Sequence, residues 1–131
     1  MILVTVLLTA TSSMFGQDKM KDEGKHGFTM KQVKAFHDVL HPLVHDALPK
    51  GDFAKIRNTL DKLLVKATAI QNAKLPKALA GRKQEFDDAC NTLVTQLEEM
   101  NAMKDKVDDD TLEKSFNEMH DTFEQLAQIA R

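Results

Sequence analysis

The stretch that decides the fold is LEKSFNEMHDTFEQLAQIA, residues 112–130. Its apolar residues recur every three or four positions: Leu112, Phe116, Met119, Phe123, Leu126, Ala127 and Ala130. A half-buried strand would alternate polar and apolar residues with a period of two, and this stretch does not. The spacing therefore predicts an amphipathic helix that buries one face. Its start lies in the run of aspartates at 108–110, where Asp110 and Glu113 have capping-box spacing.

The same apolar spacing occurs in three earlier segments, at residues 29–48, 52–73 and 86–100. Thr29 and Asp52 are the expected N-caps of the first two, and proline and glycine mark the connections. Since four helical segments follow one another and no strand pattern competes, the sequence predicts an all-α protein. Short connections force consecutive helices to run antiparallel, so the expected architecture is one up-down-up-down four-helix bundle over residues 29–131.

Composition indicates a single globular domain. The chain has 131 residues, of which 42% are hydrophobic and 29% charged, with a net charge of −2. Lysines and carboxylates are interspersed, so there is no basic stripe of the kind that binds nucleic acid. Cys90 is the only cysteine, which excludes an internal disulfide and the C-x-x-C-H motif of covalent haem attachment.

The first sixteen residues, MILVTVLLTATSSMFG, carry no charge and are too short to span a bilayer. An apolar run followed by small and polar residues is typical of a secretory signal peptide. Residues 17–28 are charged and lack periodicity, which indicates a flexible leader. We therefore expect a periplasmic or secreted protein whose mature chain has no stable membrane span.

Histidines concentrate in FHDVLHPLVHDAL, residues 36–48, where they lie four apart. On a helical wheel with Val33 at zero, His37, His41 and His45 fall at about +40°, +80° and +120°. The row therefore runs from the margin of the core toward solvent. In the last helix, with Phe116 at zero, His120 and Glu124 fall at about +40° and +80°, on the same side.

If the first and last helices pack antiparallel on these sides, His41 lies level with His120, and His37 level with Glu124. Two residues four apart on one helix face can reach one ion, and three imidazoles with a carboxylate suit zinc, copper or nickel. The predicted metal ligands are His37, His41, His120 and Glu124, with zinc or copper as the metal and His45 as a secondary ligand. Alternatively, these histidines fill the margin of the core and bond to carbonyls or carboxylates.

Pro42 directly follows His41 and removes a backbone donor. We expect the first helix to be kinked at Pro42, which would make room beside the last helix. Alternatively, the segment is two short helices with Pro42 in the first turn of the second, or the chain curves around its core.

A signal peptide followed by four helices, the last carrying His120, resembles the periplasmic bundle proteins of the cytochrome b562 and cytochrome c′ type. The resemblance is one of architecture and implies haem held between the first and last helices. Met30 and His120 are the nearest matches to the b-type ligands, with His37 or His41 as alternatives opposite His120. His120 lies farther from Arg131, and Met30 farther from the histidines, than that pattern implies.

The sequence favours a binding protein over an enzyme. It has no nucleophile beside a base, no phosphate loop and no E-x-x-H pairs of a di-iron site. The leading hypothesis is an exported bundle that buffers or delivers a transition-metal ion. The alternatives are an interaction or sensor module that contacts another exported protein, and a haem b cytochrome; the oligomeric state stays open.

Overall fold

The computed structural model describes residues 28–131, and within them every regular element is helical. The elements are α2 (Lys31–Pro42), the π-helix η1 (Leu43–Ala47), α3 (Phe53–Asn72), the 3₁₀-helix η2 (Lys77–Arg82), α4 (Lys83–Met103) and α5 (Asp109–Ile129). The predicted all-α fold class is therefore confirmed for this part of the chain. The predicted signal peptide, and the predicted leader up to residue 27, lie outside the described residues.

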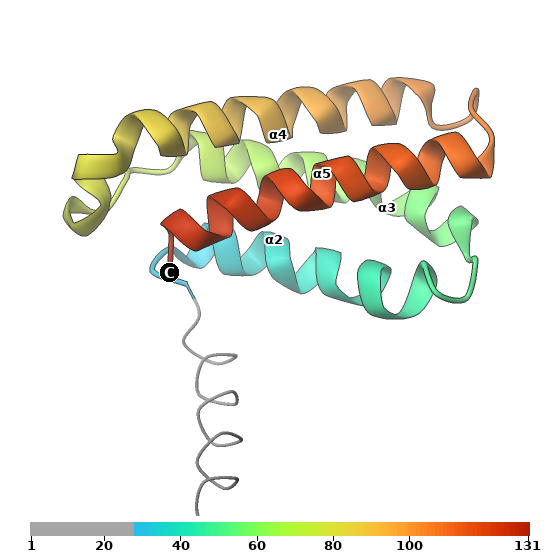
Figure 1. The fold of residues 1–131 in the computed structure, drawn as a ribbon, viewed down its shortest axis with the longest axis horizontal. Helices are drawn as coiled ribbons and strands as arrows, with labels where there is room; N and C mark the ends of the chain where they lie inside the picture. Colours follow the sequence, from blue (N-terminus) through green and yellow to red (C-terminus); the bar gives the residue numbers. More distant parts are fainter. Residues whose placement is uncertain (1–27) are drawn as a thin grey trace, which may run out of the picture.

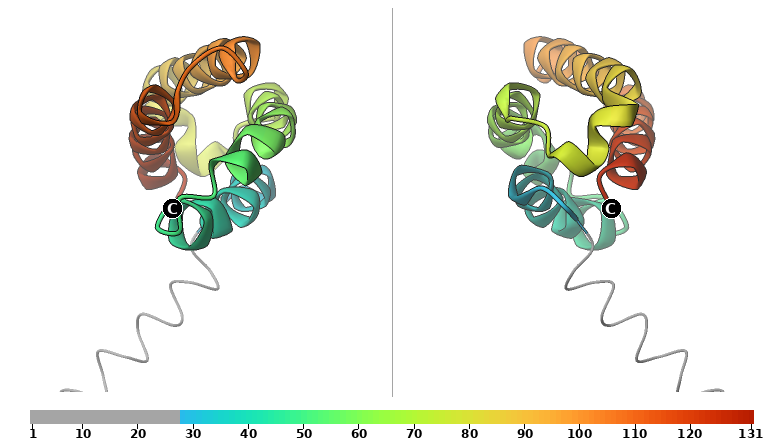
Figure 2. Two further views of the ribbon diagram at one scale, coloured as in Figure 1. Left: turned by 90° about the vertical axis from the view of Figure 1, so that its right-hand side faces the viewer. Right: turned by 90° about the vertical axis from the view of Figure 1, so that its left-hand side faces the viewer.

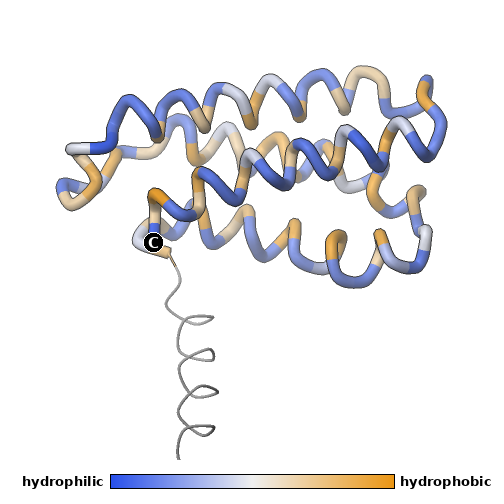
Figure 3. The backbone as a smooth tube through the Cα atoms, viewed as in Figure 1, coloured by the Kyte–Doolittle hydropathy of each residue, from blue (hydrophilic) through white to orange (hydrophobic). Residues whose placement is uncertain are grey.

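The four long helices lie side by side, and successive helices run in opposite directions (Figure 1). Views along the bundle show them arranged around a common centre (Figure 2). Hydrophobic positions alternate with hydrophilic ones along every helix, as a one-sided apolar face requires (Figure 3). The core contains three fully buried aromatic rings, those of Phe36, Phe116 and Phe123.

Aspartates begin two of the helices. The Lys55 N–H donates to Asp52 Oδ1 at 3.2 Å, so Asp52 is the N-cap of α3, as predicted. Helix α5 begins in the predicted run of aspartates, but its N-cap is Asp108, which accepts from the Thr111 N–H at 2.8 Å, and not Asp110. The expectation for Thr29 was also wrong: Met30 occupies the N-cap position of α2 and makes no side-chain cap. Three successive aspartates offer several equivalent caps, and spacing alone does not choose among them.

The connections between helices are short and held by specific bonds. Gly51, between η1 and α3, has φ of +71°, a left-handed conformation that favours glycine. Arg57 on α3 fixes the α4–α5 connection by donating to the carbonyl oxygens of Lys104 (2.7 Å) and Val107 (2.9 Å) and to Asp109 (2.8 Å). A 20% exposed side chain thus ties three elements together.

The first helical segment changes type at Pro42. Helix α2 ends there, and η1 continues the chain as a π-helix in which the Leu48 N–H donates to the Leu43 carbonyl at 2.9 Å. Proline has no N–H and crowds the preceding turn, so a change of hydrogen-bond pattern next to it has a direct cause. The sequence alternative that places Pro42 in the first turn of a second helix is wrong, because Pro42 is the last residue of α2 and η1 begins at Leu43.

The two ends of the described chain meet. The Thr29 N–H donates to the Ala130 carbonyl at 2.6 Å, and the Arg131 guanidinium lies 5.6 Å from the centre of the Phe28 ring. Phe28 packs against the core, although the sequence placed it in the leader. A single aromatic residue beside a polar run carries no periodicity, so no sequence pattern predicts this contact.

Candidate metal centre

One small cavity is lined by all five residues that the sequence singled out as metal ligands. It has a volume of about 40 Å³ and is lined by His37, Leu40, His41, Val44, His45, His120 and Glu124. We call it the histidine cavity. A single water needs roughly 10–15 Å³ on this measure, so the space suits one ion with a water or two. Side chains from the first and last helical segments therefore line one cavity.

The three histidines of α2 and η1 form a row of neighbouring rings. The ring centres of His37 and His41 are 5.3 Å apart, and those of His41 and His45 are 4.2 Å apart. His37 is half-buried, whereas His41 and His45 are exposed. This gradient agrees with the drift toward solvent that the helical wheel predicts.

The π-helix affects where His45 lies. In an unbroken α-helix, a residue four positions on is rotated by about 40°. The wider turn of a π-helix rotates each residue less, which keeps His45 over His41. The α-to-π change next to Pro42 thus accounts for the short distance between these two rings.

The other side of the cavity comes from α5. His120 Nε2 lies 3.6 Å from Glu124 Oε2, and the two side chains are 31% and 42% exposed. A carboxylate at this distance can orient an imidazole that binds a metal, or can itself be a ligand. Glu124 lines the same cavity as His37, and its negative charge acts to raise the pKa of that ring.

His37 has the least polar surroundings of the row. Its ring lies 5.3 Å from that of Phe28 and is stacked at 6.4 Å on that of Phe123. Burial, followed by the neighbouring His41, lowers the pKa of His37, although the carboxylates of Asp38 and Glu124 act in the opposite direction. The neutral imidazole, the form that binds metals, is therefore favoured.

Two phenylalanines set the spacing around the cavity. Phe36 and Phe123 stack with ring centres 4.6 Å apart. The backbones of α2 and α5 approach each other less closely than those of the other neighbouring helices. Large rings fill this gap, and the histidine cavity lies beside them at its margin.

The side chains as placed do not form a finished coordination sphere. Among residues 28–131, no group of three or more His, Cys, Asp or Glu side chains is arranged so that it could hold a metal ion. The cavity thus brings the predicted ligands to one place, and binding would require their rings to turn. Exposed rings such as those of His41 and His45 change rotamer on the picosecond-to-nanosecond timescale.

Two other residues considered from the sequence lie elsewhere. Met30, the candidate haem ligand, is 3% exposed and does not line the histidine cavity. Cys90 is buried, and burial followed by the charge of Asp87 raises the pKa of its thiol to about 12. The thiolate, the form that binds metals and attacks substrates, is strongly disfavoured there.

Phe28 and Asp38 are neighbours of His37 that the sequence pattern does not predict. Asp38 Oδ1 lies 3.8 Å from His37 Nδ1. Adjacent residues point in different directions on an ideal helical wheel, so wheel geometry does not indicate this contact.

No protein-family model matches the chain, and neither a curated protein nor a solved structure matches it. None of the helices between residues 28 and 131 has the length and apolar character needed to cross a membrane.

Proposed function

We propose that this protein is an exported helical bundle that binds a transition-metal ion, zinc or copper, in the histidine cavity. The observation that carries the proposal is that one cavity is lined by four imidazoles and one carboxylate from opposite ends of the chain. His37, His41, His120 and Glu124 are the proposed ligands, and His45 is a secondary one.

The distances between rings support this choice of ligands. With Zn–N near 2.0–2.1 Å, two imidazoles on a tetrahedral ion have ring centres about 5.2 Å apart, and at a square-planar angle of 90° about 4.5 Å. The observed separations are 5.3 Å for His37 and His41, and 4.2 Å for His41 and His45. Turning the rings about their side-chain bonds is therefore a smaller change than moving the backbone.

Exposure supports buffering or delivery over a purely structural ion. His41 and His45 face solvent, so an ion bound by them exchanges with other ligands without opening the core. The export part of the proposal rests on the apolar segment at residues 1–16. N-terminal sequencing of protein recovered outside the cytoplasm would test it separately.

The decisive experiment measures metal content and thermal stability of protein purified without a histidine tag. A ligand that binds only the folded state at 100 times its Kd stabilises by about 2.7 kcal/mol. For a domain of this size, the melting temperature would rise by roughly 10–20 °C. We expect this rise with Zn²⁺ or Cu²⁺, and its loss in His41→Ala and in His120→Ala.

Matched variants separate coordination from surface charge. Glu124→Gln is expected to reduce the response, whereas Asp121→Asn, which removes an exposed carboxylate on the same helix, leaves it intact. If both histidine variants respond to metal as the unsubstituted protein does, the proposal is wrong. A Soret band in the purified protein would support the haem b alternative instead.

A further inference from the structure

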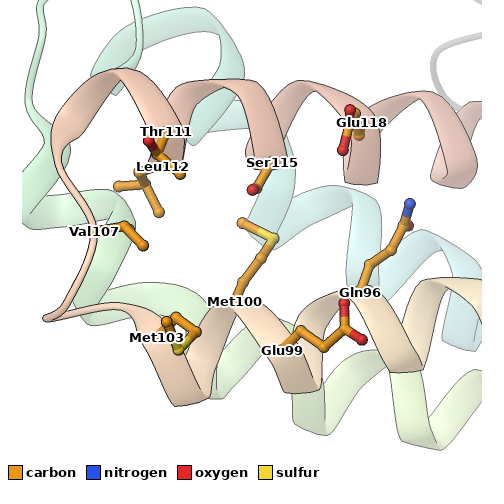
Figure 4. A pocket seen from close by; sticks show the side chains of 9 residues that line it. All are labelled: Gln96, Glu99, Met100, Met103, Val107, Thr111, Leu112, Ser115 and Glu118. Atoms are coloured by element: carbon orange, nitrogen blue, oxygen red, sulfur yellow. The ribbon is translucent and has the colours of Figure 1, made fainter.

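A second cavity, of about 280 Å³, lies between α4 and α5 next to their connection (Figure 4). We call it the α4–α5 cavity. Its volume is near the lower end of the range for small-molecule sites, roughly 300–1,000 Å³. One part of its lining is apolar and consists of Met100, Met103, Val107 and Leu112.

The apolar part includes a methionine that is unusually open to solvent. Met103 is 45% exposed, one of two large hydrophobic residues that are exposed in the described chain, whereas Met100 is 7% exposed. Methionine is flexible and polarisable, so it adapts to apolar groups of different shapes. An alkyl chain lying here would cover Met103 and extend the buried surface of Met100.

The other part of the lining is acidic. Glu99 on α4 and Glu118 on α5 lie on facing helices, at the end of the cavity away from Val107 and Met103 (Figure 4). Neither carboxylate forms an ion pair with another residue in 28–131. No Lys, Arg or His lines the cavity. The two charges therefore attract a cation and repel an anion.

Gln96, from α4, also lines the acidic end. Its Oε1 atom is buried and has no hydrogen-bond partner. A 180° turn of the amide would face this oxygen toward the cavity and exchange it with the NH₂ group. A ligand with N–H groups at this end would then donate to the oxygen.

We propose that the α4–α5 cavity binds a primary alkylammonium ion. The ammonium group lies between Glu99 and Glu118 and donates to Gln96, while the alkyl chain lies against Met100 and Met103. A neutral alcohol of the same length fills the apolar end but lacks the charge. None of the lining residues belongs to the histidine cavity, so this inference does not depend on metal binding.

Hexylammonium is the probe, and the methyl resonances of methyl-labelled methionines are the readout. We expect the Met100 and Met103 resonances to shift saturably, while that of fully buried Met119 stays in place. Hexanol, titrated in the same way, is expected to bind at least fivefold more weakly, since one charge contact at about 4 Å is worth about fivefold in Kd even in water.

Charge variants test the acidic end. Glu99→Gln and Glu118→Gln are each expected to weaken hexylammonium binding about fivefold and to leave hexanol binding unchanged. Glu98→Gln, which removes the neighbouring exposed carboxylate that does not line the cavity, is the control. Absence of a saturable shift, equal affinity for hexanol and hexylammonium, or an equal loss in Glu98→Gln would overturn the proposal.

Discussion

At the scale of single residues, the stacked rings of Phe36 and Phe123 hold α2 and α5 at their distance. Both rings are fully buried, with centres 4.6 Å apart. An aromatic pair in this geometry contributes about 0.5–1.5 kcal/mol beyond the area that it buries. His37 stacks on the outer side of Phe123, so the first imidazole of the row takes its position from this pair.

Phe123→Ala tests that role. Replacing a fully buried phenylalanine by alanine leaves a cavity and costs about 3–5 kcal/mol of unfolding free energy. Chemical denaturation would measure the loss, and the metal-dependent rise in melting temperature should fall with it. Phe53→Ala, at a half-buried site, is the control and should cost less. Equal losses at the two sites would contradict the role of the stacked pair.

At the scale of elements, sequence patterns predicted the helices better than their ends. Periodicity located α3, α4 and α5, because a buried face leaves its spacing in the sequence. The π-helix η1 and the 3₁₀-helix η2 were not predicted. Their side chains follow nearly the same apolar spacing as an α-helix over so few residues, and only the backbone hydrogen bonds distinguish them.

The N-cap of α5 predicts a pH dependence. Hydrogen bonds from the hydroxyl and the N–H of Thr111 lower the pKa of Asp108 below its ordinary value. A carboxyl group whose folded-state pKa is lowered stabilises the fold fully above its unfolded pKa, and this stabilisation is lost as the pH falls through the folded pKa. The melting temperature should therefore decline below about pH 4 through this group.

Asp108→Asn is the matched variant, since asparagine is also a good N-cap but does not titrate. Below pH 4, the difference in melting temperature between Asp108→Asn and the unsubstituted protein should shift in favour of the variant. Parallel curves from pH 3 to pH 7 would show that the cap charge makes no contribution.

At the scale of the whole molecule, Arg57 joins helices that are far apart in the sequence. Its guanidinium donates to two backbone carbonyl oxygens and to Asp109, and so links α3 with the α4–α5 connection. The α4–α5 cavity lies next to that connection and includes Val107 in its lining. One side chain therefore supports both the packing of the bundle and the shape of a cavity.

Arg57→Lys keeps the charge but loses the planar fork that reaches three acceptors. Because partly buried hydrogen bonds are lost, we expect the unfolding free energy to fall by roughly 1–2 kcal/mol. Arg82→Lys is the control, since Arg82 is exposed and pairs with Glu85 on the adjoining turn. We expect little change in the unfolding free energy of Arg82→Lys. Denaturant unfolding of both variants would show whether the Arg57 hydrogen bonds stabilise the fold.

The sequence singled out the residues that line the histidine cavity but not those of the α4–α5 cavity, and the reason is physical. Histidines are rare and polar, so their repeated spacing on two helices gave both an angle and a register. Methionines and glutamates are common on helices, and methionine at a core position such as that of Met100 is ordinary. An opening between two helices depends on how side chains from both of them pack. The residue pattern of a single helix does not predict that packing.

The bond between Thr29 and Ala130 has a topological consequence. Since Phe28 and Arg131 lie side by side, a short glycine-rich linker would join them without stretching the bundle. New termini could then open at the turn around Gly51, giving a circularly permuted protein that begins with α3 and ends with η1. In that order the histidines of α2 and α5 would be neighbours in sequence as well as in space.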